Sequence, residues 1–529
     1  MKKRFLSTLL SLILVVALVT PVWSSTLNAL PQWPDEAVYA VFNLDKPHEV
    51  AKRVASSFLF KTLALLEPDL EMASDWLKQF PVVSASVAVG MGEEGFSLQG
   101  AIKFADGKKE ILERMSRGEG QEGDVDALLN SPVPGQLSLV PFEDSVYSVA
   151  AEGMSLVLAS VEKDMLLLGF TPEDIAAARD ALNDGGKRMK LNRSLPQGSF
   201  FYFHDNGMVA TELQAESEGV LGEPVGNLVA EIGLDASDKR YDLSIFSNFA
   251  QVFSLVSDMP FEPLSMEDRI LMGGGKPWLA FMGRFFLEKK HFESIKEAGG
   301  EEVVMALEAA KQFGLDEDGI LRLLRAVGMV FGGEANLFGT PIPGGYIYLS
   351  GENKEIHLLL PIMELAAQES GLPFEAVSRS GWTALYAMED PVDFVMGIKD
   401  GVLMAGALNL DALDIMPELS DRMEALYDES NLNGFFHFDA KVMRDYVLSA
   451  LEPEGILAAF MADDEDVADT IPLFLEGLKA LVEFRSLDIT SSSMNRADVT
   501  LVTEDADQKE IDAISALAEK WVEMGADGN

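Results

Sequence analysis

The chain has 529 residues and no cysteine, so disulfides, thiolate metal sites and cysteine nucleophiles are excluded. Its 86 acidic and 41 basic residues give a formal net charge of −45, which repels phosphate backbones and predicts that nucleic acid is not a partner. A hydrophobic share of 48% is typical of a globular chain, and a chain of this length can bury a large core.

The N-terminus has the pattern of a secretory signal peptide. Basic residues at positions 2–4 precede an apolar run over 5–19, and small residues follow from Ser24. The run is shorter than the ~20 residues that span a bilayer, and no later segment is long enough to do so. We predict a signal peptide over 1–24 that is cleaved after Ser24, with a retained anchor as the alternative. The mature chain is then expected in the periplasm or outside the cell, without a stable membrane span.

Five segments of the first half recur in the same order in the second half, which predicts a tandem duplication. The pairs are 37–46 with 277–286, 98–110 with 343–355, 146–170 with 383–407, 198–205 with 434–441, and 237–246 with 493–502. Short helices interrupt them, at 50–66, 171–182, 409–426 and elsewhere. We therefore predict a signal peptide over 1–24 and two lobes, over 31–262 and 277–503. A Gly-rich linker over 263–276 joins the lobes, and a C-terminal amphipathic helix with its tail follows over 504–529.

The strands of each lobe alternate apolar and polar residues and follow one another at hairpin spacing, which favours antiparallel pairing. Helices of 10–20 residues interrupt the runs of strands rather than alternating with them regularly. The predicted fold class is therefore α+β. It has two tandem homologous lobes, each with antiparallel sheets of short, hairpin-linked strands packed against helices.

Two aromatic strands raise the question of a histidine site. The segments GSFFYFHD (198–205) and GFFHFDAK (434–441) each place a histidine near an aspartate. Side chains alternate along a strand, so His204 and Asp205 point apart, whereas His437 and Asp439 share a face. We expect a buried strand with its phenylalanines on the core face (Phe201, Phe203, Phe436 and Phe438). The pair of His437 and Asp439 is retained as a candidate polar site.

Other chemistry has little support in the sequence. Glu152 and Glu389 occupy matching positions in the two repeats, and a turn role is the alternative to a catalytic one. The acidic clusters at 316–319 and 462–469 lack the ligand spacing of an EF-hand, so weak divalent cation binding competes there with helix starts and solvated loops. No nucleophile elbow, phosphate loop or dinucleotide fingerprint is present, so no cofactor and no catalytic or metal residue is predicted.

The leading interpretation is an exported, non-enzymatic protein that binds or scaffolds an unknown protein or an apolar ligand. One alternative is a carrier of lipid or hydrophobic peptide, because the 31 phenylalanines and 24 methionines are sufficient to line a groove. The second alternative is an exported hydrolase that acts through carboxylates. Diverged duplicates of enzymes often keep one site and lose the other. No polar constellation is expected here that one copy preserves and the other has lost, which disfavours the enzyme.

Overall fold

The structure is a computed structural model that describes residues 25–527 with internal gaps. The gaps are 34–37, 58–59, 62–67, 93–94, 133–134, 136, 144, 152–153, 184–187, 190, 192, 196–197, 218–222, 238, 253–262, 266–275, 285–288, 338–339, 371–372, 388–391, 415–420, 430, 453–464 and 494. Ser24, Glu152 and Glu389 lie outside the described residues, as do the signal peptide and the three glycines of the predicted linker.

The chain forms two compact units. Unit 1 comprises residues 1–258 and 495–506, and unit 2 comprises residues 259–494 and 507–529. The short segment 495–506 thus belongs with the N-terminal half, although it follows most of unit 2 in sequence. The predicted boundary at 263–276 stays a prediction, because most of that linker is not described.

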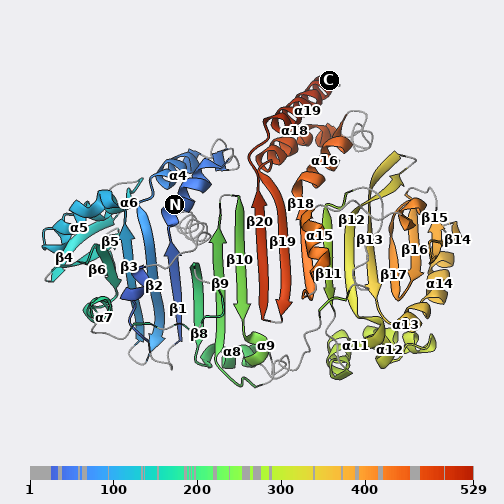
Figure 1. The fold of residues 1–529 in the computed structure, drawn as a ribbon, viewed down its shortest axis with the longest axis horizontal. Coiled ribbons are helices and arrows are strands. Elements are labelled where there is room, and N and C mark those ends of the chain that lie inside the picture. Colours follow the sequence, from blue (N-terminus) through green and yellow to red (C-terminus); the bar gives the residue numbers. More distant parts are fainter. Residues whose placement is uncertain are drawn as a thin grey trace. The chain divides into compact units, whose positions relative to one another are not determined.

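Unit 1 is built on one antiparallel sheet, with strand order β4-β5-β6-β7-β3-β2-β1-β8-β9-β10-β20 (Figure 1). The strands are β1 (Val38–Asp45), β2 (Val82–Gly92), β3 (Gly95–Phe104), β4 (Leu137–Glu143), β5 (Val146–Ala151), β6 (Met154–Glu162), β7 (Met165–Gly169), β8 (Ser199–Asp205), β9 (Leu228–Ala236), β10 (Arg240–Ser247) and β20 (Arg496–Thr503).

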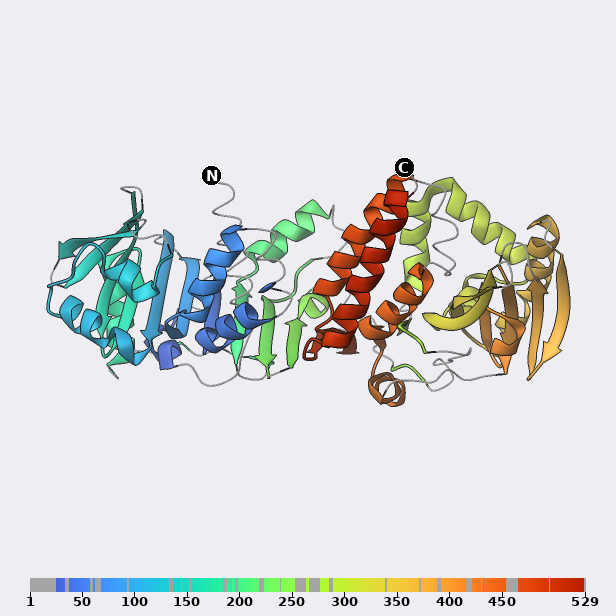
Figure 2. The ribbon, with the colours of Figure 1, turned by 90° about the horizontal axis from the view of Figure 1, so that it is seen from above.

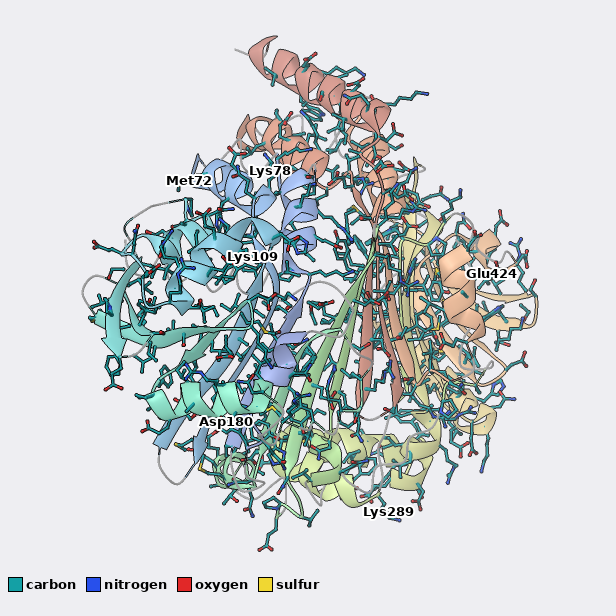
Figure 3. The ribbon with its side chains drawn as sticks, turned by 60° about the vertical axis from the view of Figure 1, so that its left-hand side comes forward. Met72, Lys78, Lys109, Asp180, Lys289 and Glu424 are labelled. Atoms are coloured by element: carbon teal, nitrogen blue, oxygen red, sulfur yellow. The ribbon has the colours of Figure 1, made fainter. Side chains whose placement is uncertain are left out.

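Helices cover parts of both faces of the unit 1 sheet. They are η1 (Ser25–Ala29), α2 (Pro47–Ser56), α4 (Pro68–Lys78), η2 (Asp106–Lys108), α5 (Lys109–Ser116), α6 (Asp124–Leu129), α7 (Pro172–Leu182), α8 (Met208–Glu216) and α9 (Phe249–Val252). The α5 and α6 helices pack on Ile102 and Leu166, whereas α7 and η1 pack on Ala101 and Leu167 of the same strands. Neighbouring residues of a strand point to opposite faces, so these two groups lie on opposite faces. Figure 3 labels Lys109 on α5 and Asp180 on α7.

Unit 2 has an antiparallel sheet with strand order β14-β15-β16-β17-β13-β12-β11-β18-β19. The strands are β11 (Leu279–Arg284), β12 (Ala326–Leu337), β13 (Thr340–Ser350), β14 (Phe374–Arg379), β15 (Trp382–Ala387), β16 (Phe394–Lys399), β17 (Val402–Ala407), β18 (Gly434–Asp439) and β19 (Phe484–Ser493).

Two clusters of buried residues form the core of unit 2. The larger one packs η4 and α15 on one face of the sheet, and the other packs α12, α13 and α14 on the opposite face. The α18 and α19 helices run side by side in Figure 2. The helices are α11 (Lys289–Gln312), α12 (Glu317–Leu323), α13 (Asn353–His357), α14 (Leu360–Ser370), η4 (Leu410–Leu413), α15 (Asp421–Asp428), α16 (Ala440–Leu451), α18 (Glu465–Ala480) and α19 (Gln508–Asp527).

The predicted α+β class is confirmed, and the strand order from β14 to β19 repeats the order from β4 to β9. Four of the five recurring sequence segments fall on strands that hold the same place in this order. This agreement supports the inference of a tandem duplication. Two helices differ from the sequence prediction. The helix expected over 50–66 is described as α2, which ends at Ser56 and is followed by an extended Ser57. The single helix expected after β17 is described as η4 and, beyond the gap at 415–420, α15.

The fifth recurring pair consists of strands β10 and β20, which pair with each other in unit 1. Leu243 lies opposite Val499, and equivalent side-chain contacts occur on the two sides of this residue pair. Ser244 donates a hydrogen bond to Asp498, and Thr500 donates one to Asp242. Each aspartate also forms an ion pair with the arginine two residues before it, Arg240 and Arg496, at 2.7 and 2.9 Å. The arginine and aspartate retained in both segments therefore form a locally two-fold seam.

A glycine retained at matching positions of β7 and β17 has a packing reason. A Cβ at Gly406 would lie 2.2 Å from the carbonyl oxygen of Gly345, and one at Gly169 would lie 2.6 Å from the Cβ of Asp174. Neither position has room for a side chain.

The tight turns before β7 and β17 are also as predicted. Lys163 with Asp164, and Asp400 with Gly401, have the two positive φ angles of two-residue hairpin loops.

Candidate functional site

The aromatic strands β8 and β18 bury the face opposite to the one predicted. Phe200, Tyr202, Phe435 and His437 are buried, whereas the four phenylalanines expected on the core face are only half-buried (Phe201, Phe203, Phe436 and Phe438). The prediction of the core face was therefore wrong. The other side of each strand is packed into the core, with η1 and Leu191 among its neighbours in unit 1 and α15 in unit 2. Polar groups on that side are tolerated because they find partners there.

His437 pairs with Asp488 and not with Asp439. Its Nδ1 lies 2.6 Å from Oδ1 of Asp488 on β19, and both side chains are almost fully buried. Asp439 instead accepts a hydrogen bond from the backbone N–H of Val442, which caps α16, and forms an ion pair with Arg485 at 3.3 Å. Nε2 of His437 makes no hydrogen bond to any described residue. The predicted His437–Asp439 pair is thus not brought together, and Asp488 is the partner that sequence analysis missed.

The matching positions of unit 1 are occupied by Tyr202 and Glu231. Tyr202 lies opposite Glu231 in the β8–β9 ladder, as His437 lies opposite Asp488 in the β18–β19 ladder. Glu231 accepts hydrogen bonds from the backbone N–H groups of Ser194 and Leu195, at 2.7 and 3.2 Å. Arg193 contributes a positive charge 3.8 Å away. Burial, followed by the neighbouring Tyr39, raises the pKa of Tyr202, so its phenol stays neutral.

A chain of hydrogen bonds on the buried face of unit 1 has no counterpart among the residues of unit 2 that the structure describes. The Thr26 and Ser86 hydroxyls are 2.8 Å apart, Ser86 donates to Asn43 at 2.7 Å, and Asn43 donates to the carbonyl of Gly198 at 3.0 Å. By strand register, Asn43 and Ser86 correspond to Met282 and Gly328. The expectation that no polar constellation is present in one half and missing from the other was therefore wrong. This chain of hydrogen bonds pairs no nucleophile with a general base. It links η1 to the sheet.

Asp45 ends the buried row of β1, and its environment disfavours the carboxylate. Burial raises the pKa of Asp45 to about 6, against the smaller opposing effect of Lys46. A raised pKa means that the folded state holds a proton that the unfolded state has released. The associated stabilisation is present below about pH 4 and is lost as pH rises through about 6.

We expect Asp45→Asn to stabilise unit 1 relative to the native chain by about 1–2 kcal/mol at pH 7, after allowance for solvent screening, and by nearly nothing at pH 4. The asparagine keeps the shape of the side chain but cannot ionise. Urea unfolding at both pH values measures the difference. The matched control is Asp75→Asn, which removes an exposed carboxylate from α4 and should change the free energy of unfolding equally at the two pH values. A pH-independent effect of Asp45→Asn would contradict this account.

The face of the unit 1 sheet that carries Phe42 has an apolar row that helices leave open. This row, the unit 1 strip, crosses five adjacent strands from β2 to β10 and consists of Val87, Phe42, Phe201, Ile232 and Ile245, each opposite the next. Phe42 is 41% exposed, and its ring centroid lies 4.9 Å from that of Phe201. Cover begins two residues farther along β1, where Leu44 packs against α2 and α4.

Unit 2 has an open apolar row that matches the unit 1 strip at four of its five strand positions. This row, the unit 2 strip, crosses five adjacent strands from β13 to β19 and consists of Ile347, Met329, Phe281, Phe436 and Ile489. Phe281 is 39% exposed and lies opposite Phe436, as Phe42 lies opposite Phe201. Cover begins at Leu349, two residues beyond Ile347, which packs with the cluster under α12, α13 and α14.

The strips are places for side-chain contact and not for chemistry. The backbone groups beneath them are paired within the sheets, so a partner cannot be bound there by adding a strand. Apolar side chains in the middle of a sheet face are otherwise covered in globular proteins, and contiguous exposed ones mark binding surfaces. Both units have this property at four matching strand positions, although their buried faces differ.

Other sites expected from the sequence can be placed only in part. Asp316 caps α12 by accepting a hydrogen bond from the N–H of Gly319 at 2.8 Å, as the helix-start interpretation requires. Among the described residues, no three potential metal ligands of the His, Cys, Asp or Glu type lie together. Within the same part of the chain, no helix has the length and apolar character to cross a membrane.

No protein family and no curated protein matches this chain. Solved structures of TP0453 match weakly. Crystal form III has 12% identity and a TM-score of 0.23, and the match covers 44% of this chain and 81% of that one. Crystal form I has 14% identity and a TM-score of 0.21, with coverage of 42% and 77%. Scores this low carry no argument about fold or function.

Proposed function

We propose that this chain is an exported, non-enzymatic binding protein whose unit 1 and unit 2 strips bind an apolar partner. The observation that carries the proposal is the recurrence of an open row of large apolar side chains, centred on Phe42 in unit 1 and on Phe281 in unit 2. Export rests on the signal-peptide pattern of residues 1–24.

The buried polar groups support a binding role over a catalytic one. His437 and Asp488 are almost fully buried, and the Thr26–Ser86–Asn43 chain is internal. A catalytic group has to reach its substrate, and these groups are placed instead to satisfy one another. The open strips lack such groups, so the strip side chains themselves recognise a partner by burial of apolar surface.

Binding of the neutral dye Nile red to the purified full chain tests the proposal. We expect Phe42→Thr and Phe281→Thr each to remove about half of the bound dye, because each substitution truncates the centre of one of two equivalent strips. Threonine suits a strand, so the fold should be kept. The matched control is Phe142→Thr, which removes a 51% exposed phenylalanine of β4 outside the strips. Equal losses for all three variants would sink the proposal.

A further inference from the structure

We infer that the occupant of the strips is a cationic amphipathic polypeptide segment, about 13 residues long when helical. This inference rests on the proposed function and goes beyond it by naming the chemistry of the partner. Three features of the chain carry it: the extent of each strip, the state of the backbone beneath it, and the net charge of the chain.

The extent of the strips sets the length of the segment. Each strip crosses five adjacent strands, from Val87 to Ile245 in unit 1 and from Ile347 to Ile489 in unit 2. Four spacings of about 4.8 Å give about 19 Å. A helix rises about 1.5 Å per residue, so about 13 residues match this distance. An amphipathic helix presents apolar side chains over its whole length, as such a row requires.

The backbone beneath the strips favours a partner with its own hydrogen bonds satisfied. Phe42 and Phe281 lie in central strands that are paired on both sides. An extended peptide placed on this face would find no strand edge and would lose backbone hydrogen bonds to water without replacement. A helix satisfies its own backbone and buries only its apolar side.

The net charge of the chain indicates the sign of the charge that its partner carries. The chain carries a net charge of −45, so an anionic lipid surface and a second copy of the chain are both repelled. The helices that follow the strands of each unit share this acidic excess. In unit 1, α8 has two exposed glutamates, Glu212 and Glu216, and no basic residue. In unit 2, α18 has four acidic residues and one lysine. A segment with lysine or arginine beside its apolar face complements the net acidic charge of the chain.

Two 14-residue fluorescent peptides with leucines at helical spacing test the inference by fluorescence anisotropy. One carries lysine at every polar position and the other carries glutamate. At 50 mM NaCl we expect the lysine peptide to bind the full chain at least about tenfold more tightly, and we expect 500 mM NaCl to reduce this advantage. The Phe42→Thr/Phe281→Thr variant should weaken binding at least about tenfold, whereas Phe142→Thr should not.

Several outcomes would overturn the inference. Equal affinity for the two peptides would show that charge does not select the partner. Lysine-peptide binding that is unchanged by the strip substitutions would show non-specific electrostatic attraction. Strip-dependent binding to phosphatidylcholine vesicles in place of the peptide would assign the strips to lipid, and strip-dependent dimers in sedimentation would assign them to a second copy. Nile red binding distinguishes failure of this inference from failure of the proposed function. Its loss in the strip variants supports the proposed function even where the peptide result contradicts the inference.

Discussion

The variant Arg444→Met is expected to lower the free energy of unfolding of unit 2 by about 3–5 kcal/mol. Arg444 is fully buried, and its guanidinium holds three helices together. It donates to Glu510 at the start of α19 at 2.6 Å, and to the carbonyls of Leu481, Val482 and Phe484 that follow α18, at 2.8–3.2 Å. Methionine fills a similar volume but leaves Glu510 and three carbonyls without these donors.

Urea unfolding followed by tryptophan fluorescence measures this loss. Trp521 reports directly on α19, because it is buried and donates to the carbonyl of Leu451 at 2.9 Å. Its emission should shift to the red in Arg444→Met if α19 detaches. Lys520→Met is the matched control, since the Lys520–Glu452 pair is half exposed and should contribute less than about 1 kcal/mol. A loss below about 1 kcal/mol in Arg444→Met would contradict the role given to this arginine.

The second large effect is expected at the buried pair of unit 2. His437→Ala removes a hydrogen-bond partner of Asp488, which is completely buried, and should cost about 3–5 kcal/mol. The cost arises mostly from the loss of this interaction by a buried carboxylate, with a smaller contribution from the cavity. Urea unfolding of the full chain measures it.

A double variant separates the charge from the cavity. Replacing both residues by apolar ones, in His437→Leu/Asp488→Leu, removes the carboxylate together with its partner and should cost less than His437→Ala alone. The reverse order would show that the pair is stabilising in its own right. His204→Ala is the control in unit 1, where the half-buried imidazole stacks on Tyr39 with centroids 5.0 Å apart and should cost only about 1 kcal/mol.

Local signals in the sequence were sufficient for the elements themselves. Thr171 and Pro172 open α7, where Thr171 and Asp174 form a capping box, and α19 spans the predicted amphipathic segment. The hairpin turns follow from residues that tolerate positive φ, such as Asp164 and Gly401. In each of these cases the interacting residues are neighbours in the chain, so a single sequence contains the whole signal.

The candidate sites depended on information that a single sequence lacks. Alternation showed that Phe201 and Tyr202 face opposite ways, but not which face helices would cover. We assigned the aromatic face to the core because apolar residues are usually buried, and the structure buries Tyr202 and His437 instead. Asp488 lies 51 residues from His437, and only the β18–β19 pairing brings the two together. The same missing information concealed the strips.

The most direct test of the proposed function is the number of Nile red molecules bound per chain, measured by equilibrium dialysis. The account predicts binding at two equivalent places in the native chain, at one in Phe42→Thr or Phe281→Thr, and near none in the double variant, with unchanged circular dichroism. Phe142→Thr should bind as the native chain does. A folded double variant that binds as much dye as the native chain would contradict the claim that the strips are the binding surface.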